Sequence, residues 1–138
     1  MTIRLIDFGL SCLDVSKSEE YVGSMEYVSP EIISNVEYDP YLTDVYSFGI
    51  LCFALIERRF PYQIVHFTKI VKGIKVGKYM MIDLPNLSSA FIGCQDQEIK
   101  KIITRCLLFD PMLRPTMLDL EVDLRNRDNR VSVIRSSV

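Results

Sequence analysis

The sequence lacks closely paired cysteines and a strong excess of basic residues. Its four cysteines, Cys12, Cys52, Cys94 and Cys106, show no Cys-x-x-Cys spacing, and two of them lie within apolar helical patterns. We therefore interpret them as reduced, buried thiols of an intracellular protein. The formal net charge is -2, and the basic residues are spread along the chain except for a modest cluster at Arg125, Arg127 and Arg130. Binding to nucleic acid or to an anionic membrane surface is not expected.

Long apolar runs are also missing. The first apolar stretch, residues 3–6, is interrupted by Arg4 and stops at Asp7, so it lacks the uninterrupted core of a signal peptide. The run over residues 48–56 is far too short to cross a bilayer. These absences predict an intracellular protein, in the cytoplasm first and in the nucleus as the alternative. The sequence has no repeats and no Pro-rich or Gly-rich linker, as expected of one domain or part of one.

The predicted elements are mainly helical. Residues 3–6 predict a short β-strand that ends at Asp7. Ser29-Pro30 opens a short helix, because Pro is tolerated in the first helical turn. The longest helix is predicted over residues 43–58, with Thr43 as its N-cap. It is apolar on nearly every face, which is typical of a buried helix that runs through the middle of a domain.

Three further helices are predicted in the second half of the chain. One amphipathic helix follows Asp96, a good N-cap, and repeats apolar residues at helical spacing from Ile99 to Leu107. Another is expected within residues 62–80, before the breaks at Gly73 and Gly77. A last short helix is expected over residues 117–124, capped by Thr116.

Four short motifs now stand in order along the chain. They are Asp7-Phe8-Gly9, GSMEYVSPE at residues 23–31, DVYSFG at residues 44–49 and CLLFDPMLRPT at residues 106–116. Together they resemble the C-terminal lobe of eukaryotic protein kinases of the serine/threonine type. The resemblance implies a mainly α fold, a partial kinase C-lobe with a short N-terminal β-strand and a buried central helix. It divides the chain into a partial kinase domain, 1–125, and a C-terminal tail, 126–138.

The resemblance assigns the first motif to metal binding. The match to Asp7 holds Mg²⁺ against the nucleotide phosphates, the match to Phe8 packs between the lobes, and the match to Gly9 lets the chain turn into the activation loop. A hard cation needs an oxygen anion on a rigid support. The alternative is an acidic strand end that merely begins a loop.

The second motif resembles the end of the activation segment, which positions the substrate. Ser24 takes the place of a hydroxyl residue that contacts the catalytic apparatus, and Tyr27 and Pro30 belong to the same segment. Glu31 and Arg114 match a family ion pair that links this segment to the last helices. The alternative for these two residues is a pair of unrelated surface charges.

The third motif carries two structural positions. The family match to Asp44 accepts hydrogen bonds from the backbone of the catalytic loop, and Gly49 closes the motif. Tyr46 stands where the family usually has Trp. Without that loop, Asp44 would be a buried carboxylate without a partner, which is costly.

Candidate phosphorylation sites lie between the first two motifs. Ser16, Ser18 and Tyr21 are ordinary phosphoacceptors in a polar loop. Glu20 lies near the position that is usually phosphorylated, with Glu19 beside it, so a carboxylate could partly replace a phosphate. A solvated acidic loop is the alternative.

Several parts of a kinase have no match in this sequence. His66 is its one histidine and lies in an ordinary apolar pattern, so there is no His-Arg-Asp motif, no catalytic base and no asparagine for a second metal. We also find no Gly-rich phosphate loop and no strand lysine. No residue is therefore assigned a catalytic role.

These observations favour a fragment of a serine/threonine protein kinase that is inactive by itself. Mg²⁺ and ATP would serve the parent kinase, and neither is expected to bind tightly to this chain alone. Its partners would be a protein substrate or a complementing kinase lobe. The alternative is a non-catalytic kinase-like module that docks a partner or competes with an intact kinase. An unrelated helical domain would not explain four ordered motifs.

Overall fold

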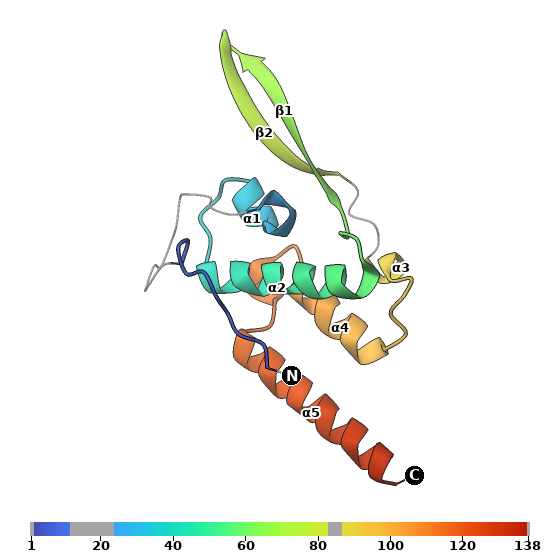
Figure 1. Cartoon of the computed structure of the whole chain (residues 1–138). Helices are drawn as coiled ribbons and strands as arrows, with labels where there is room; N and C mark the ends of the chain where they lie inside the picture. Colours follow the sequence, from blue (N-terminus) through green and yellow to red (C-terminus); the bar gives the residue numbers. More distant parts are fainter. Residues whose placement is uncertain (1, 12–23, 83–86, 138) are drawn as a thin grey trace.

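A computed structural model describes residues 2–11, 24–82 and 87–137 of the chain. This part is mostly helical, as the sequence predicts, and its elements follow in the order η1 (Met25–Tyr27), α1 (Pro30–Ile33), α2 (Pro40–Glu57), β1 (Gln63–Val71), β2 (Ile74–Ile82), α3 (Leu87–Ala90), α4 (Gln97–Cys106), η2 (Pro111–Leu113) and α5 (Met117–Ser136). In Figure 1, α2 lies across the middle, the β-hairpin extends to one side of it, and α5 extends to the other. Within the described residues, every helix is too short or too polar to cross a membrane.

Helix α2 begins earlier than the sequence predicts. Asp39, not Thr43, is its N-cap, and the Asp39 carboxylate accepts a hydrogen bond of 2.8 Å from the backbone N–H of Tyr41. Pro40 then occupies the first turn, where its missing N–H costs nothing. The Thr43 hydroxyl lies inside the helix and is 3.1 Å from the carbonyl oxygen of Asp39. The helix ends where Arg58 adopts a left-handed conformation (φ 55°).

Helix α2 buries one face rather than all of its surface. Val45, Tyr46, Ile50 and Phe53 are at most 1% exposed. Leu55 lies on a different face and is 71% exposed. The buried face packs in three clusters: Phe53 with Phe91 and Ile103, Val45 with Ile102, Cys106 and Leu120, and Tyr46 and Ile50 with Tyr62. The sequence predicts a buried helix through the middle of the domain, and in the structure this burial is limited to one face of α2.

The predicted N-terminal strand is absent from the described residues. Residues 2–11 contain no strand, and all of them are exposed. An isolated strand leaves its backbone N–H and C=O groups without partners, so an extended sequence becomes a stable strand only when a neighbour pairs with it. The described part of the chain places no such neighbour beside residues 3–6.

The predicted helix within residues 62–80 is instead an antiparallel hairpin. Strands β1 and β2 pair from Gln63 opposite Ile82 to Val71 opposite Ile74. The two turn residues, Lys72 (φ 50°) and Gly73 (φ 80°), both have the left-handed conformation of a type I′ turn. The sequence prediction overlooked this turn and the many β-branched and aromatic residues of β1, which favour a strand over a helix.

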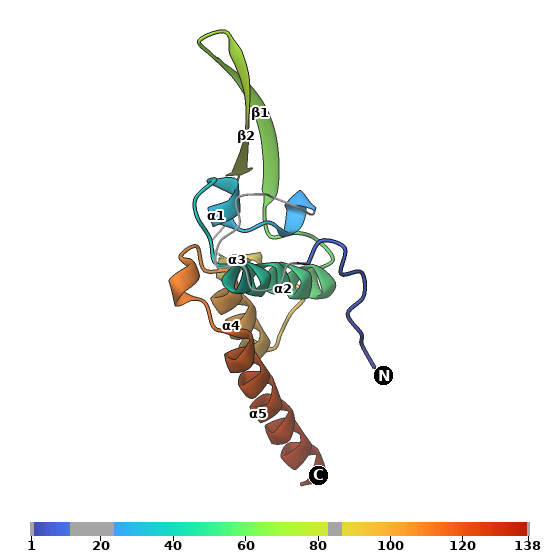
Figure 2. The ribbon, with the colours of Figure 1, turned by 90° about the vertical axis from the view of Figure 1, so that its left-hand side faces the viewer.

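The last helices begin where the sequence predicts. Asp96 caps α4 by accepting hydrogen bonds from the N–H groups of Glu98 and Ile99. At the start of α5, the side chains of Thr116 and Asp119 bond to each other's backbone N–H groups in a reciprocal cap. Helix α5 is longer than expected and continues through residue 126 to Ser136. Figure 2 shows its C-terminal part extending away from the body.

Candidate functional site: the buried Glu31–Arg114 pair and its surroundings

The structure brings Glu31 and Arg114 together, although they are 83 residues apart in sequence. Arg114 Nη1 lies 2.6 Å from Glu31 Oε1, and Arg114 Nη2 lies 2.8 Å from Oε2. Both side chains are almost fully buried, at 0% and 6% exposed. This two-point geometry is the strong form of a carboxylate–guanidinium contact. The pairing predicted from the sequence is present, and the alternative of two unrelated surface charges is wrong.

All five N–H donors of Arg114 have acceptors. Besides Glu31, Arg114 donates from Nε to the carbonyl oxygen of Leu108 (2.8 Å), from Nη1 to that of Leu42 (3.0 Å) and from Nη2 to that of Phe109 (3.2 Å). Its guanidinium carbon also lies 4.8 Å from the ring centre of Tyr46. Arg114 therefore joins α1, α2 and the α4–η2 connection at one point.

The pKa of Glu31 reflects two opposing effects. Burial raises it, but the hydrogen bonds and the charge of Arg114 outweigh burial and hold the pKa below its ordinary value. The Thr43 hydroxyl lies 3.3 Å from Glu31 Oε1 and 3.1 Å from the carbonyl oxygen of Asp39, so its single proton can be donated to either acceptor. Glu31 is thus ionised in the folded chain at neutral pH.

The segment at Asp7 is open to solvent. Asp7 has a left-handed backbone (φ 60°), and the N–H of Gly9 donates to its carboxylate over 3.3 Å. Phe8 is 68% exposed, and it belongs to none of the hydrophobic clusters formed by the described residues. Within the described residues, no group of three or more His, Cys, Asp or Glu side chains could hold a metal ion. One exposed carboxylate does not make a Mg²⁺ site, so the described residues do not fit this metal by themselves.

The second motif forms the wall of a cleft. Ser24 precedes η1 and is exposed, and Pro30 is buried in the first turn of α1. The carbonyl oxygen of Tyr27 accepts a hydrogen bond of 2.9 Å from the Ser47 hydroxyl. The ring of Tyr27 contacts the ring of Phe60 edge to face, with the two ring centres 5.4 Å apart. The cleft has a volume of about 630 Å³. It is lined by Met25, Glu26, Arg59, Phe60, Tyr62, Gln63 and Ile64.

The third motif has one buried and one exposed residue of interest, Gly49 and Asp44. A Cβ atom on Gly49 would lie 2.6 Å from Cys106 Cβ, so the glycine permits the close contact between α2 and α4. Asp44 was expected to be buried without a partner, but the structure exposes it. Partial desolvation raises the pKa of Asp44. The candidate phosphorylation sites Ser16, Ser18 and Tyr21 lie outside the described residues.

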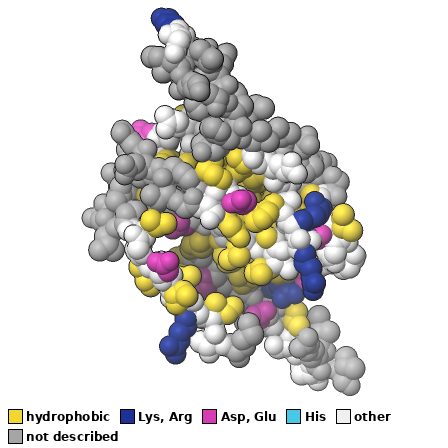
Figure 3. Space-filling model, turned by 45° about the horizontal axis from the view of Figure 1, so that its top comes forward, with side chains coloured by type: hydrophobic (Ala, Val, Ile, Leu, Met, Phe, Trp, Pro, Cys, Tyr) yellow, Lys and Arg dark blue, Asp and Glu magenta, His cyan; other side chains and the backbone are white. Residues whose placement is uncertain are grey.

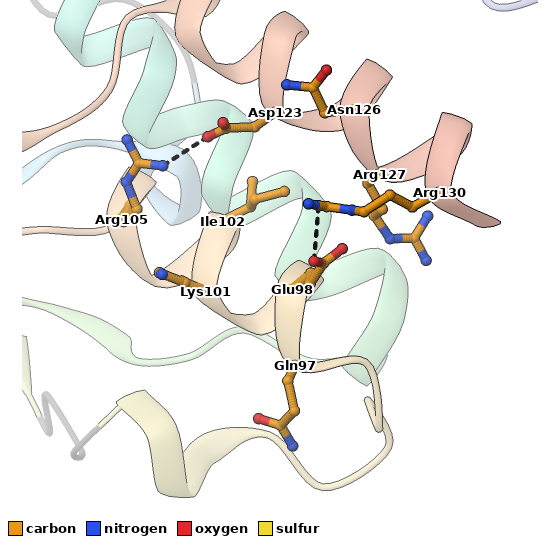
Figure 4. A pocket seen from close by; sticks show the side chains of 9 residues that line it. All are labelled: Gln97, Glu98, Lys101, Ile102, Arg105, Asp123, Asn126, Arg127 and Arg130. Atoms are coloured by element: carbon orange, nitrogen blue, oxygen red, sulfur yellow. Dashed lines mark hydrogen bonds and ion pairs between the residues drawn. The ribbon is translucent and has the colours of Figure 1, made fainter. Parts of the chain in front are cut away.

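Two polar features of the structure were not expected from the sequence. The Glu57 carboxylate accepts hydrogen bonds from the backbone N–H groups of Ile92, Gly93 and Cys94, which anchors the end of α2 to the chain before α4. The second feature is a cleft of about 400 Å³ between α4 and α5, shown in Figure 4. Ion pairs cross between these helices: Arg105 with Asp123, Arg127 with Asp96 and Arg130 with Glu98. No local signal in the sequence pairs these residues, because only packing brings the helices together.

Exposed apolar side chains gather on the body of the molecule. On α2, Leu51, Leu55 and Ile56 are 43%, 71% and 38% exposed, and Ile92 nearby in the chain before α4 is 74% exposed. Figure 3 shows hydrophobic side chains grouped in the middle of one face, with basic side chains toward its rim. Exposed apolar side chains that gather on one part of a protein are typical of an interaction site.

Comparisons with known proteins place the chain among protein kinases. The family described as the protein kinase domain matches residues 1–122. A putative serine/threonine-protein kinase/receptor of Acanthamoeba polyphaga mimivirus is 33% identical over 129 residues, which are 90% of this chain and 8% of the relative. In Dictyostelium discoideum, the probable serine/threonine-protein kinase MARK-A is 32% identical over 120 residues (86% of this chain, 10% of the relative), and mkcD is 35% identical over 121 residues (86% and 17%).

The chain therefore spans less than a fifth of the length of each of these relatives. The family match covers the four motifs, including both ends of the buried pair between Glu31 and Arg114. The family match and the relatives lead to one conclusion: the chain belongs to the eukaryotic protein kinase family.

Proposed function

We propose that this chain is a C-lobe part of a serine/threonine protein kinase, with residues 1–125 as the partial kinase domain and residues 126–138 as the tail. The observation that carries the proposal is the buried two-point contact between Glu31 and Arg114. Its two ends lie in the second and fourth kinase-like motifs, and it joins the end of the activation segment to the last helices. A surface pair would not require this burial or the three extra carbonyl acceptors.

The remaining motif residues take supporting roles in this proposal. Asp7 would supply one carboxylate to the Mg²⁺ site of a longer kinase, with Phe8 and Gly9 at the start of the activation segment. Ser24 and Tyr27 would face a protein substrate, which is consistent with the cleft beside Met25 and Phe60. Asp44 would hold the missing catalytic loop, and its exposure leaves it accessible to that partner.

The 138-residue chain by itself should not transfer phosphate. Phosphoryl transfer depends on positioning and on charge neutralisation by metal ions, a lysine and a phosphate-binding loop. The sequence contains no His-Arg-Asp motif, and the described residues offer no complete metal site. We propose an intracellular location, in the cytoplasm, consistent with this function.

A second candidate is a non-catalytic module that docks a partner or competes with an intact kinase. The exposed apolar side chains of Leu51, Leu55 and Ile56 favour it, since they offer α2 as a docking face. The same face would be covered by the other helices of a complete lobe in the first proposal. Reading the transcript upstream of Met1 separates the two: an in-frame His-Arg-Asp segment and nucleotide lobe supports the kinase part, and a genuine upstream stop supports the module.

The direct test is transfer of radiolabelled phosphate to a generic serine/threonine substrate. The purified chain should give background transfer. The protein restored with its upstream kinase region should be active, and Asp7→Asn in that protein should abolish transfer without unfolding it, because it removes one charge and little volume. Transfer by the 138-residue chain that Asp7→Asn eliminates would refute the proposal that essential parts are missing.

A further inference from the structure

The hairpin formed by β1 and β2 is a two-stranded sheet with two outer edges. Each strand has nine residues, and the sheet contains no further strand in the described part of the chain. Figures 1 and 2 show that the hairpin extends away from α2 and that most of its length stands clear of the other described elements. An isolated two-stranded hairpin is marginally stable in water, and added strands stabilise it. Its edges are therefore templates for a further strand.

The turn determines which backbone groups point to each edge. In the type I′ turn at Lys72 and Gly73, the flanking residues Val71 and Ile74 form a hydrogen-bonded pair. Hydrogen-bonded and non-hydrogen-bonded pairs alternate along an antiparallel ladder. The backbone groups of Phe67 therefore point toward β2. Those at the outer edge of β1 belong to Ile64, His66, Thr68 and Ile70.

We propose that β1 pairs antiparallel with β1 of a second copy of this chain, around a two-fold axis at Phe67. The result is one four-stranded sheet in which the two β1 strands are central. Phe67 lies opposite Phe67 of the second copy in a non-hydrogen-bonded pair. His66 then lies opposite Thr68, and Ile64 opposite Ile70, each pair occurring twice. About eight backbone hydrogen bonds form, two for each of these four pairs.

The order of residues in β1 makes it self-complementary. In this register Lys69, the one lysine of the strand, lies opposite Val65 of the second copy. At the strand ends, Gln63 of each copy lies opposite Val71 of the other. Aromatic pairs and pairs of β-branched residues are favourable across strands. A two-fold contact of this kind uses the same surface on both copies and closes after two chains.

The outer edge of β2 is less suited to the same contact. Antiparallel pairing of β2 with itself over all nine residues would place Lys78 opposite Lys78 and Gly77 opposite Tyr79. Like charges that lie directly opposite each other are unfavourable, and glycine contributes no side-chain contact. Charge and composition therefore select β1 as the edge for a second copy. The proposed kinase function is not required for this association.

Proline variants test which edge is used. Thr68→Pro removes an N–H at the outer edge of β1 and keeps the β1–β2 ladder, since Pro is tolerated where the N–H faces away from the neighbouring strand. Tyr79→Pro is the matched control, because the N–H of Tyr79 points to the outer edge of β2. Sedimentation equilibrium of the full chain should give a dimer for the original sequence and for Tyr79→Pro. For Thr68→Pro we expect the dissociation constant to rise at least about tenfold.

Cysteine variants test the register even if Thr68→Pro fails to fold. A non-hydrogen-bonded pair brings the two Cα atoms to about 4.5 Å, which suits a disulfide. Under mild oxidation Phe67→Cys should form covalent dimers well above the level of the original chain. Val65→Cys should not do so alone, but it should cross-link in a mixture with Lys69→Cys.

Three results would overturn the proposal. The first is a chain that stays monomeric at every concentration tested. The second is equal cross-linking by Phe67→Cys and Val65→Cys, which would mean a different register or non-specific contact. The third is a dimer that is lost in Leu55→Lys but kept in Thr68→Pro, which would assign the association to the exposed face of α2.

Discussion

Truncation of Arg114 is expected to be among the most destabilising single changes in this chain. Arg114→Ala removes the guanidinium that satisfies Glu31 and leaves a buried carboxylate without its partner. Breaking a buried ion pair in this way costs about 3–5 kcal/mol. A whole domain is stable by only about 5–15 kcal/mol, so the folded population of Arg114→Ala should fall sharply.

The contacts of Arg114 predict a graded series of variants. Glu31→Gln keeps an acceptor for Arg114 but loses the charge, so it should destabilise less than Arg114→Ala. Arg114→Lys should not restore the stability lost in Arg114→Ala, because the Lys ammonium cannot reproduce the planar two-point contact with Glu31 and the three contacts with carbonyl oxygens. Replacing both partners by apolar residues, as in Glu31→Leu with Arg114→Met, should still cost about 2 kcal/mol or more, because the carbonyls of Leu42, Leu108 and Phe109 lose their donor.

The assay is urea unfolding followed by far-ultraviolet circular dichroism, at one protein concentration for all variants. The matched control is Arg125→Ala, which removes the exposed pair with Glu121 and should change the free energy of unfolding by about 0.5 kcal/mol or less. In the double-mutant cycle of Glu31→Ala and Arg114→Ala, we expect a coupling energy of about 1–3 kcal/mol. Additive effects, each below about 1 kcal/mol, would refute the reasoning from burial.

Three further predictions follow from single side chains. Folding lowers the pKa of Glu31 from 4.5, so the ionised carboxylate contributes fully to stability above pH 4.5, and this contribution is lost as the pH falls through the lower folded-state pKa. Glu31→Gln should therefore flatten the dependence of stability on pH in this acid range. An unchanged pH profile of unfolding would contradict this prediction. Gly49→Ala should destabilise the chain by about 1–2 kcal/mol in urea unfolding, although alanine has the better helix propensity, because the added Cβ would lie 2.6 Å from Cys106 Cβ. A variant more stable than the original chain would show that α4 shifts to accommodate the methyl group. Burial raises the pKa of Cys106 to about 12, so iodoacetamide at pH 8 should leave this thiol unlabelled until urea unfolds the chain, as read by peptide mass spectrometry.

Features that depend on a few neighbouring residues could be predicted from the sequence. Ser29-Pro30 starts α1 and Asp96 caps α4, because capping involves groups within one helical turn. The order of the four motifs predicted the family, and two of these motifs predicted the pair of Glu31 and Arg114. The roles of Asp7 and Ser24 in a kinase stay predictions.

Other features were decided only by tertiary structure. The apolar sequence of α2 does not reveal which of its faces finds a partner, and Leu55 stays exposed because no described element covers it. Residues 3–6 have strand-like composition but form no strand in the described chain, whereas residues 63–82 form one hairpin because each strand supplies the other's hydrogen bonds. The reason is the same in each case: a helix satisfies its backbone groups within its own segment, but strand pairing and burial require a second surface, and only the folded chain supplies it.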